Sequence, residues 1–211
     1  MTTVVLVRHG QSLGNAYSMF LGHTDLGLSP VGKRQAEEVA AYLDRYSFDR
    51  LYASDLLRAV ETATPTALRQ KLTVETDEAL REIYAGEWEK RTVDDIRDRY
   101  PEAYRIWSHD IGHATPTGGE SVCALSRRIF AAFDRIVADN PDKTVLVVTH
   151  GTPIRLLTCR FLLRDVSFAA TVPFAPNASV TTVTVDCGRY TLSETGYDGF
   201  LSDKTNFTGH F

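Results

Sequence analysis

Short apolar runs rich in β-branched residues alternate along the chain with longer amphipathic segments. Continuous apolar runs of this length predict buried strands, and the amphipathic segments between them predict helices. The predicted strands are Val4–Arg8, Arg50–Ala53, Leu72–Glu75, Thr144–Thr149 and Val180–Val185, with Tyr190–Ser193 as a sixth. This alternation predicts an α/β fold: a three-layer sandwich with a mostly parallel central sheet of about five or six strands flanked by helices.

The predicted helices carry recognisable start and stop signals. Ser29-Pro30 opens one of them with a capping serine and a proline at the first helical position. Ser54 or Asp55 is expected to cap the next, over residues 56–70, and Pro65 should bend or interrupt it. Two further helices are expected within residues 118–139 and 152–163.

Residues 81–118 do not fit the alternation. This stretch carries both tryptophans, Trp88 and Trp107, several tyrosines and mixed charges, and it closes on a segment rich in glycine and proline. We expect it to be a small lid insertion that shapes a substrate pocket within a single domain spanning residues 1–211. The end of the chain, residues 202–211, is expected to be a tail or a flap over the site.

The carboxyl ends of the predicted strands deliver one set of polar residues. Ligands bind at these ends in open α/β sheets. The first strand ends in Arg8-His9-Gly10 and the fourth in Thr149-His150-Gly151, while Arg58 follows the second strand and Glu82 the third. Two histidines, two arginines and a glutamate are therefore expected to meet at one edge of the sheet.

The chemistry of this set points to a phosphoryl group. Arginine forks match phosphate oxygens bidentately and stay charged, which suits Arg8 and Arg58. Two guanidiniums beside His9 should lower its pKa and keep the imidazole neutral, and a neutral imidazole is a nucleophile. Gly10 and Gly151 are expected to let backbone amides approach the anion.

The stretches that carry these residues resemble the histidine phosphatase superfamily, the phosphoglycerate mutase-like group. The matching motifs occur in the family's order and cover residues 4 to about 155: LVRHGQSLGN, GHTDLGLSPVGKRQA, YASDLLRAVETA, LREIYAGEWE, PTGGES and VVTHGTPIR. Lys90 departs from the pattern, because the family often has a glycine after Trp-Glu.

The resemblance implies a role for each matching residue. His9 would become the phosphohistidine, and Glu82 would protonate the leaving group and then activate water. The residues implied in binding the substrate are Arg8, Asn15, Gly22, His23, Arg58, His150 and Gly151. Such catalysis is mostly electrostatic clamping of the transferred group, so neither a metal nor a cofactor is implied.

The spacing between Glu82 and His150 favours the phosphatase branch of the family. The two residues are 68 positions apart, whereas the mutases carry longer insertions there. The predicted function is a metal-independent phosphomonoester hydrolase that acts on small phosphorylated metabolites through a phosphohistidine. Two alternatives are a bisphosphate-primed phosphoglycerate mutase and a non-catalytic module that binds phosphorylated ligands.

Plainer explanations exist for several of these residues. His9 and His150 could be strand-end histidines bonded to the backbone, and Arg58 could be a helix-surface residue paired with Asp55 or Glu61. The pair His109 and His113, four positions apart, has the spacing of a helical metal site, but the nearby Gly112, Pro116 and Gly118 make a stable helix there doubtful.

Composition limits the partners and the location. A net charge of −4 argues against nucleic-acid binding. No apolar stretch is long enough for a membrane span, and no secretion signal is expected. The three cysteines fit a reducing cytoplasm. We therefore interpret Asn177-Ala-Ser and Asn206-Phe-Thr as chance matches to the glycosylation pattern. A homodimer through an edge strand is compatible with the sequence, although no feature indicates one.

Overall fold

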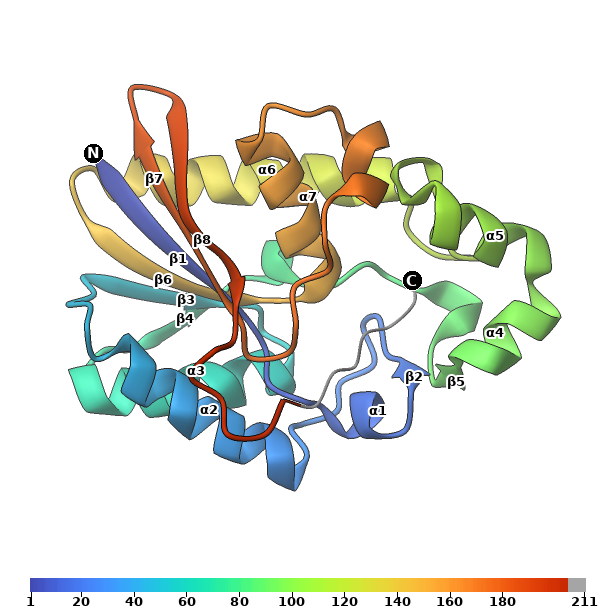
Figure 1. The fold of residues 1–211 in the computed structure, drawn as a ribbon, viewed down its shortest axis with the longest axis horizontal. Coiled ribbons are helices and arrows are strands. Elements are labelled where there is room, and N and C mark those ends of the chain that lie inside the picture. The colour runs from blue at the N-terminus through green and yellow to red at the C-terminus, as the bar shows by residue number, and fades with distance from the viewer. Residues whose placement is uncertain (205–211) are drawn as a thin grey trace.

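The computed structural model describes residues 1–204 and is built around a six-stranded sheet (Figure 1). Its strands lie in the order β4-β3-β6-β1-β7-β8. Strands β4, β3, β6 and β1 run parallel, and β7 and β8 are antiparallel additions at one edge. The strands are β1 (Thr2–Arg8), β3 (Arg50–Ala53), β4 (Val74–Thr76), β6 (Thr144–Thr149), β7 (Val180–Asp186) and β8 (Arg189–Tyr197).

Helices cover both faces of the sheet. On one face lie α2 (Pro30–Leu43) and α3 (Leu57–Gln70), and on the other lie α6 (Val122–Asp139) and α7 (Gly151–Phe161), as Figure 1 shows. Alternate side chains of β1 enter the two cores: Val5 and Val7 pack toward α2 and α3, and Val4 and Leu6 toward α6 and α7. The predicted α/β sandwich with a mostly parallel sheet is confirmed.

The predicted helix starts are confirmed for α2 and wrong for α3. Ser29 caps α2, because its hydroxyl accepts a hydrogen bond from the amide of Gly32 at 3.0 Å. Helix α3 begins after Leu56 with no side-chain cap, and Asp55 instead pairs with Arg81.

Helix α3 also continues through Pro65 instead of breaking there. A proline inside a helix removes one backbone hydrogen bond. The loss is tolerated because one face of α3 packs into the core on both sides of the proline. The residues buried on that face include Ala59, Thr62, Ala63, Thr66 and Ala67.

Residues 81–118 form a group of short elements beside the sheet (Figure 1). After a 3-10 turn (Gly86–Trp88) come β5 (Arg91–Thr92), α4 (Val93–Arg99), α5 (Pro101–His109) and a second 3-10 turn (Ile111–His113). Strand β5 pairs with β2 (Met19–Phe20), which follows the short helix α1 (Leu13–Ala16). The rings of Phe20, Trp88 and Trp107 pack edge to face in the apolar cluster of this region.

Candidate active site

Two histidines meet where the two central parallel strands end. Arg8 of β1 lies opposite Thr149 of β6, so the next residue of each strand, His9 and His150, leaves the sheet at the same level. Their ring centroids are 5.1 Å apart in an edge-to-face arrangement. The sheet register therefore produces the histidine pair that the strand ends predicted.

The ring of His9 is fixed in one tautomer. Its Nδ1 lies 2.7 Å from the carbonyl oxygen of Gly10, which can only accept, so Nδ1 carries the proton. Burial lowers the pKa of His9 well below its ordinary value, and the nearby charges of Arg58 and Arg8 lower it further. The neutral imidazole consequently has its lone pair on Nε2, and His9 lines a pocket at this edge of the sheet.

The Arg8 guanidinium is buried beside His9. One of its terminal nitrogens donates to the carbonyl of Ala175 at 2.6 Å, and its carbon lies 4.6 Å above the centre of the Phe174 ring. Its Nε has no hydrogen-bond partner within residues 1–204. Burial lowers the pKa of Arg8 to about 10, so it stays charged at neutral pH and can bind an anion in the pocket.

Arg58 reaches the same pocket from the first turn of α3 and is only 1% exposed. Its two terminal nitrogens donate to the carbonyls of Thr24 at 3.0 Å and Gly22 at 2.8 Å. Burial lowers its pKa to about 10. A surface ion pair with Asp55 or Glu61 does not form: Asp55 bonds to Arg81, and Glu61 accepts from the amide of Leu28.

Glu82 lies in the loop after β4 and lines the pocket. Its carboxylate accepts hydrogen bonds from the backbone amides of Ile83 at 2.8 Å and Thr152 at 3.2 Å. Its own carbonyl lies 2.9 Å from Nε2 of His23 and accepts from the Arg128 guanidinium at 3.2 Å. Both the side chain and the backbone of Glu82 are thus held in place.

His150 is fully buried at the N-terminus of α7. Neither of its ring nitrogens has a hydrogen-bond partner in the part of the chain that the structure describes. Burial, the charges of Arg58 and Arg8, and the neighbouring His9 lower its pKa well below the ordinary value. A buried polar group without a partner is costly, which favours a ligand or functional explanation over a structural one.

Asn15 is oriented by a buried asparagine that the sequence did not indicate as functional. The Oδ1 of Asn15 accepts from the amide of Ser12 at 3.1 Å and from Nδ2 of Asn177 at 3.2 Å. The same Nδ2 donates to the carbonyl of His9 at 3.0 Å. Because Oδ1 is engaged, Nδ2 is the group of Asn15 that can face a ligand. Asn177 is 2% exposed, so it is no glycosylation acceptor in this fold, and Asn206 lies outside the described residues.

Of the remaining residues that were expected to bind the substrate, some line the pocket and others do not. Gly22 lines the pocket, whereas His23 lies behind Glu82 and does not. Gly151 makes room for Phe174, whose ring would lie 2.2 Å from a Cβ at this position. Gly10 was expected to offer its amide to an anion, and this is wrong: the amide donates to the Thr62 hydroxyl at 3.0 Å.

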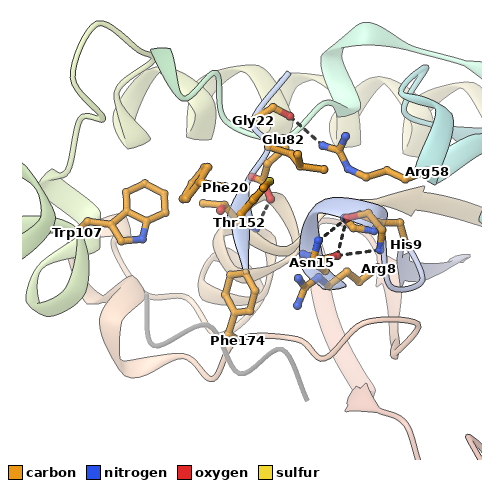
Figure 2. Close-up of a pocket in the computed structure, with 13 residues that line it drawn as sticks. Arg8, His9, Asn15, Phe20, Gly22, Arg58, Glu82, Trp107, Thr152 and Phe174 are labelled. Carbon is orange, nitrogen blue, oxygen red and sulfur yellow. Dashed lines mark hydrogen bonds between the residues drawn. The ribbon is translucent and has the colours of Figure 1, made fainter. Parts of the chain in front are cut away.

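The pocket has a polar and an aromatic side. Figure 2 shows Arg8, His9, Asn15 and Arg58 on one side, Phe20 and Trp107 on the other, and Glu82 between them. The empty space, including the open mouth, is about 440 Å³. Lining residues that the sequence did not identify are Ser12, Met19, Phe20, Leu21, Thr152 and Phe174.

The pair His109 and His113 forms no metal site. His109 contacts the carbonyl of Arg105 on its own helix, and His113 bonds to Asp110 at 2.9 Å. Within residues 1–204 no group of three or more histidine, cysteine, aspartate or glutamate side chains is arranged to hold a metal ion. No helix of that part is long and apolar enough to cross a membrane.

Two buried arginines around a neutral histidine, at the strand ends of an α/β sheet, define an enzyme that handles phosphoryl groups. Residues 4–198 match the model of the histidine phosphatase superfamily, branch 1. The chain belongs to this family and is a phosphatase.

Relatives and structural neighbours of the chain include proteins named as phosphatases. The chain is 32% identical over 167 residues to phosphoserine phosphatase 1 of Hydrogenobacter thermophilus, covering 79% of each chain. Bacillus stearothermophilus YhfR has a similar structure, with a TM-score of 0.90, 30% identity and coverage of 95% of this chain and 99% of that one. A mycobacterial glucosyl-3-phosphoglycerate phosphatase has a TM-score of 0.84 at 32% identity, covering 90% of this chain and 96% of its own.

Proposed function

We propose that the protein hydrolyses phosphate monoesters of small metabolites through a phosphohistidine on His9. The observation that carries this proposal is the hydrogen bond from Nδ1 of His9 to the Gly10 carbonyl, which leaves the lone pair on Nε2. In the first step Nε2 attacks phosphorus and the bond to the ester oxygen breaks. The electron pair of that bond goes to the leaving oxygen, which takes a proton from the Glu82 carboxyl group.

In the second step water resolves the phosphoenzyme. The Glu82 carboxylate takes a proton from water while the water oxygen attacks phosphorus, and the electron pair of the P–N bond returns to His9. Arg8, Arg58, His150 and the Nδ2 amide of Asn15 stabilise the charge on the phosphoryl oxygens throughout. These groups supply the electrostatic stabilisation that metal ions supply elsewhere, so we propose a metal-independent reaction.

We also propose a setting for this reaction. The relatives are named for phosphorylated small molecules, which supports a free metabolite as the partner, and the net charge of −4 argues against nucleic acid. A cytoplasmic location without a membrane partner is part of this proposal, and the small, odd number of cysteines supports it. A homodimer stays a prediction, and β8 is one of the two edge strands of the sheet.

The test measures free phosphate release from a panel of esters in the presence of EDTA, with 3-phosphoglycerate also analysed for isomerisation. The wild type is compared with His9→Ala and with the control His113→Ala, an exposed histidine outside the pocket. We expect release and acid-quenched phosphoenzyme in the wild type and control, and neither in His9→Ala.

The other outcomes separate the alternatives. Isomerisation without phosphate release would identify a mutase. Tight binding of esters with no turnover would identify a binding module. Full activity of His9→Ala would contradict the phosphohistidine itself.

A further inference from the structure

The side of the pocket away from the arginines is an apolar wall. It consists of Met19, Phe20, Leu21 and Trp107, whereas the ring of Phe174 lies beside the Arg8 guanidinium. The Phe20 and Trp107 rings pack edge to face with centroids 5.4 Å apart, and both belong to the apolar cluster formed with residues 81–118. Figure 2 shows the two rings on the side of Glu82 that is remote from Arg8. A leaving group that departs past Glu82 therefore meets apolar surface.

The charged residues that line the pocket all have proposed roles in binding or transferring the phosphoryl group. Among the lining residues within 1–204 the cations are Arg8 and Arg58, both on the phosphoryl side, and the carboxylate is Glu82. A second anionic group on the leaving group would face Glu82 and the aromatic rings with no cation to pair it. Moving a carboxylate out of water without a partner is strongly unfavourable.

We propose that the physiological leaving group is uncharged and largely apolar, and that it binds against Met19, Phe20 and Trp107. Esters whose alcohol carries a carboxylate are then poor substrates, although phosphoserine, for which one relative is named, has such a group. This inference rests on the proposed phosphatase function and narrows its substrate class. Phe20 and Trp107 are specificity-determining residues in this view, and they take no part in the chemistry.

The first experiment compares two esters with the same kind of leaving oxygen. 2-Phenylethyl phosphate and the phosphate ester of 3-hydroxypropanoate both release a primary alcohol, so they differ mainly in the apolar or anionic character of the remainder. We expect kcat/KM to be roughly tenfold or more higher for the phenylethyl ester, the usual scale for burying an apolar group in a pocket. An equal or reversed ranking would overturn the inference and leave the phosphatase intact.

The second experiment introduces the cation that the wall lacks. Met19→Lys places an ammonium group at a partly exposed lining position, and Tyr17→Lys adds the same charge two residues away at a position that is 68% exposed and outside the pocket. We expect Met19→Lys to shift the ratio of kcat/KM values about tenfold toward the carboxylated ester, as a charge-assisted hydrogen bond would. Tyr17→Lys should leave the ratio unchanged.

Each outcome of these measurements has one meaning. An unchanged ratio in Met19→Lys, or an equal shift in Tyr17→Lys, would show that the leaving group does not lie against the wall. If the wild type neither hydrolyses the two esters nor forms the phosphoenzyme, the proposed function is overturned, and this inference with it.

Discussion

The phosphoryl side and the apolar side of the pocket come from different kinds of structure. Arg8 and His9 line the phosphoryl side, and they and the neighbouring His150 are placed by two adjacent parallel strands whose register is fixed along six residue pairs. Phe20 and Trp107 come instead from a two-residue strand and a short helix. The first side is held by the sheet, and the second by the packing of side chains among short elements.

The two sides also differ in what burial does to stability. On the phosphoryl side burial is unfavourable: it lowers the pKa values of both arginines to about 10, and the ring nitrogens of His150 have no partner within residues 1–204. On the apolar side burial is the stabilising contribution itself. The buried polar groups of the phosphoryl side should therefore lower the free energy of unfolding, although the reaction requires them. The apolar side should raise it. The following changes test that contrast.

The largest effect is expected from His150→Leu. Removing one group that stabilises the transferred phosphoryl should lower kcat/KM by a factor on the order of 10² to 10³. The same change removes two buried ring nitrogens that lack partners, so the free energy of unfolding should rise by about 1 kcal/mol or more. Phosphate release and urea unfolding measure the two effects. Lower activity with lower stability would mean that the His150 ring is chiefly structural.

Phe20→Ala should have the opposite effect: a large loss of folding stability and a smaller loss of activity. Truncating a buried phenylalanine usually costs about 3 to 5 kcal/mol of folding free energy. We expect a loss of this size in urea unfolding, with a smaller effect on turnover of ethyl phosphate than His150→Leu produces. Phe168→Ala is the matched control, because Phe168 is 55% exposed. A loss as small as that of the control would contradict the structural role of the apolar side.

The contrast also explains what the sequence could predict. Each strand of the sheet is a short apolar run, and Arg8, His9 and His150 lie where such runs end, so their convergence could be derived from the carboxyl ends of the strands in an open α/β sheet. Glu82 could be placed only by resemblance, because an isolated glutamate after a strand is usually solvated.

The apolar side could not be derived in this way. Residues 81–118, which include Trp107, were expected to shape a substrate pocket, but nothing in the local sequence of Met19 or Phe20 distinguishes a pocket wall from ordinary core. Asn177 was missed for a related reason: its role depends on a loop that returns to β1, where its amide contacts His9 and Asn15. The interruption considered at Pro65 does not occur for the same reason, because the core packing of α3 outweighs the local signal of the proline.

Asn177 allows a finer test of the phosphoryl side. Asn177→Ala should lower kcat/KM roughly tenfold by releasing the orientation of Asn15, on the scale of one lost hydrogen bond to a functional group. Asn177→Asp should be worse than Asn177→Ala, because an aspartate oxygen would repel Oδ1 of Asn15 and favour a flipped amide. Steady-state kinetics of both variants decide the point. Equal losses would mean that Asn177 acts only by packing.

The buried histidines predict how stability depends on pH. The pKa values of His9 and His150 are lowered in the folded protein, whereas in the unfolded chain they return to the ordinary value of 6.5. Below pH 6.5 the unfolded state therefore binds more protons, so stability is present above this pH and is lost as the pH falls. Each histidine should cost up to about 1.4 kcal/mol between pH 7.5 and 5.5.

Urea unfolding at the two pH values, with wild type and His150→Leu side by side, measures this contribution. The variant should lose less stability than the wild type on acidification. Exposed His113 has a raised pKa and acts in the opposite direction, but it is present in both proteins and cancels in the comparison. A steeper dependence in the variant would contradict the assignment of a neutral, buried His150.

The smallest effect concerns Lys90, which directly precedes β5, the strand that pairs with β2. Lys90 adopts a φ of 63°, where residues with a Cβ are strained, at the position where the family often has glycine. Lys90→Gly should therefore raise the free energy of unfolding by roughly 0.5 to 1 kcal/mol. Lys33→Gly, at an exposed position in the first turn of α2, should lower it by roughly 0.5 to 1 kcal/mol. Urea unfolding measures both, and a loss at Lys90 would mean that the lysine side chain contributes more to stability than the strain costs.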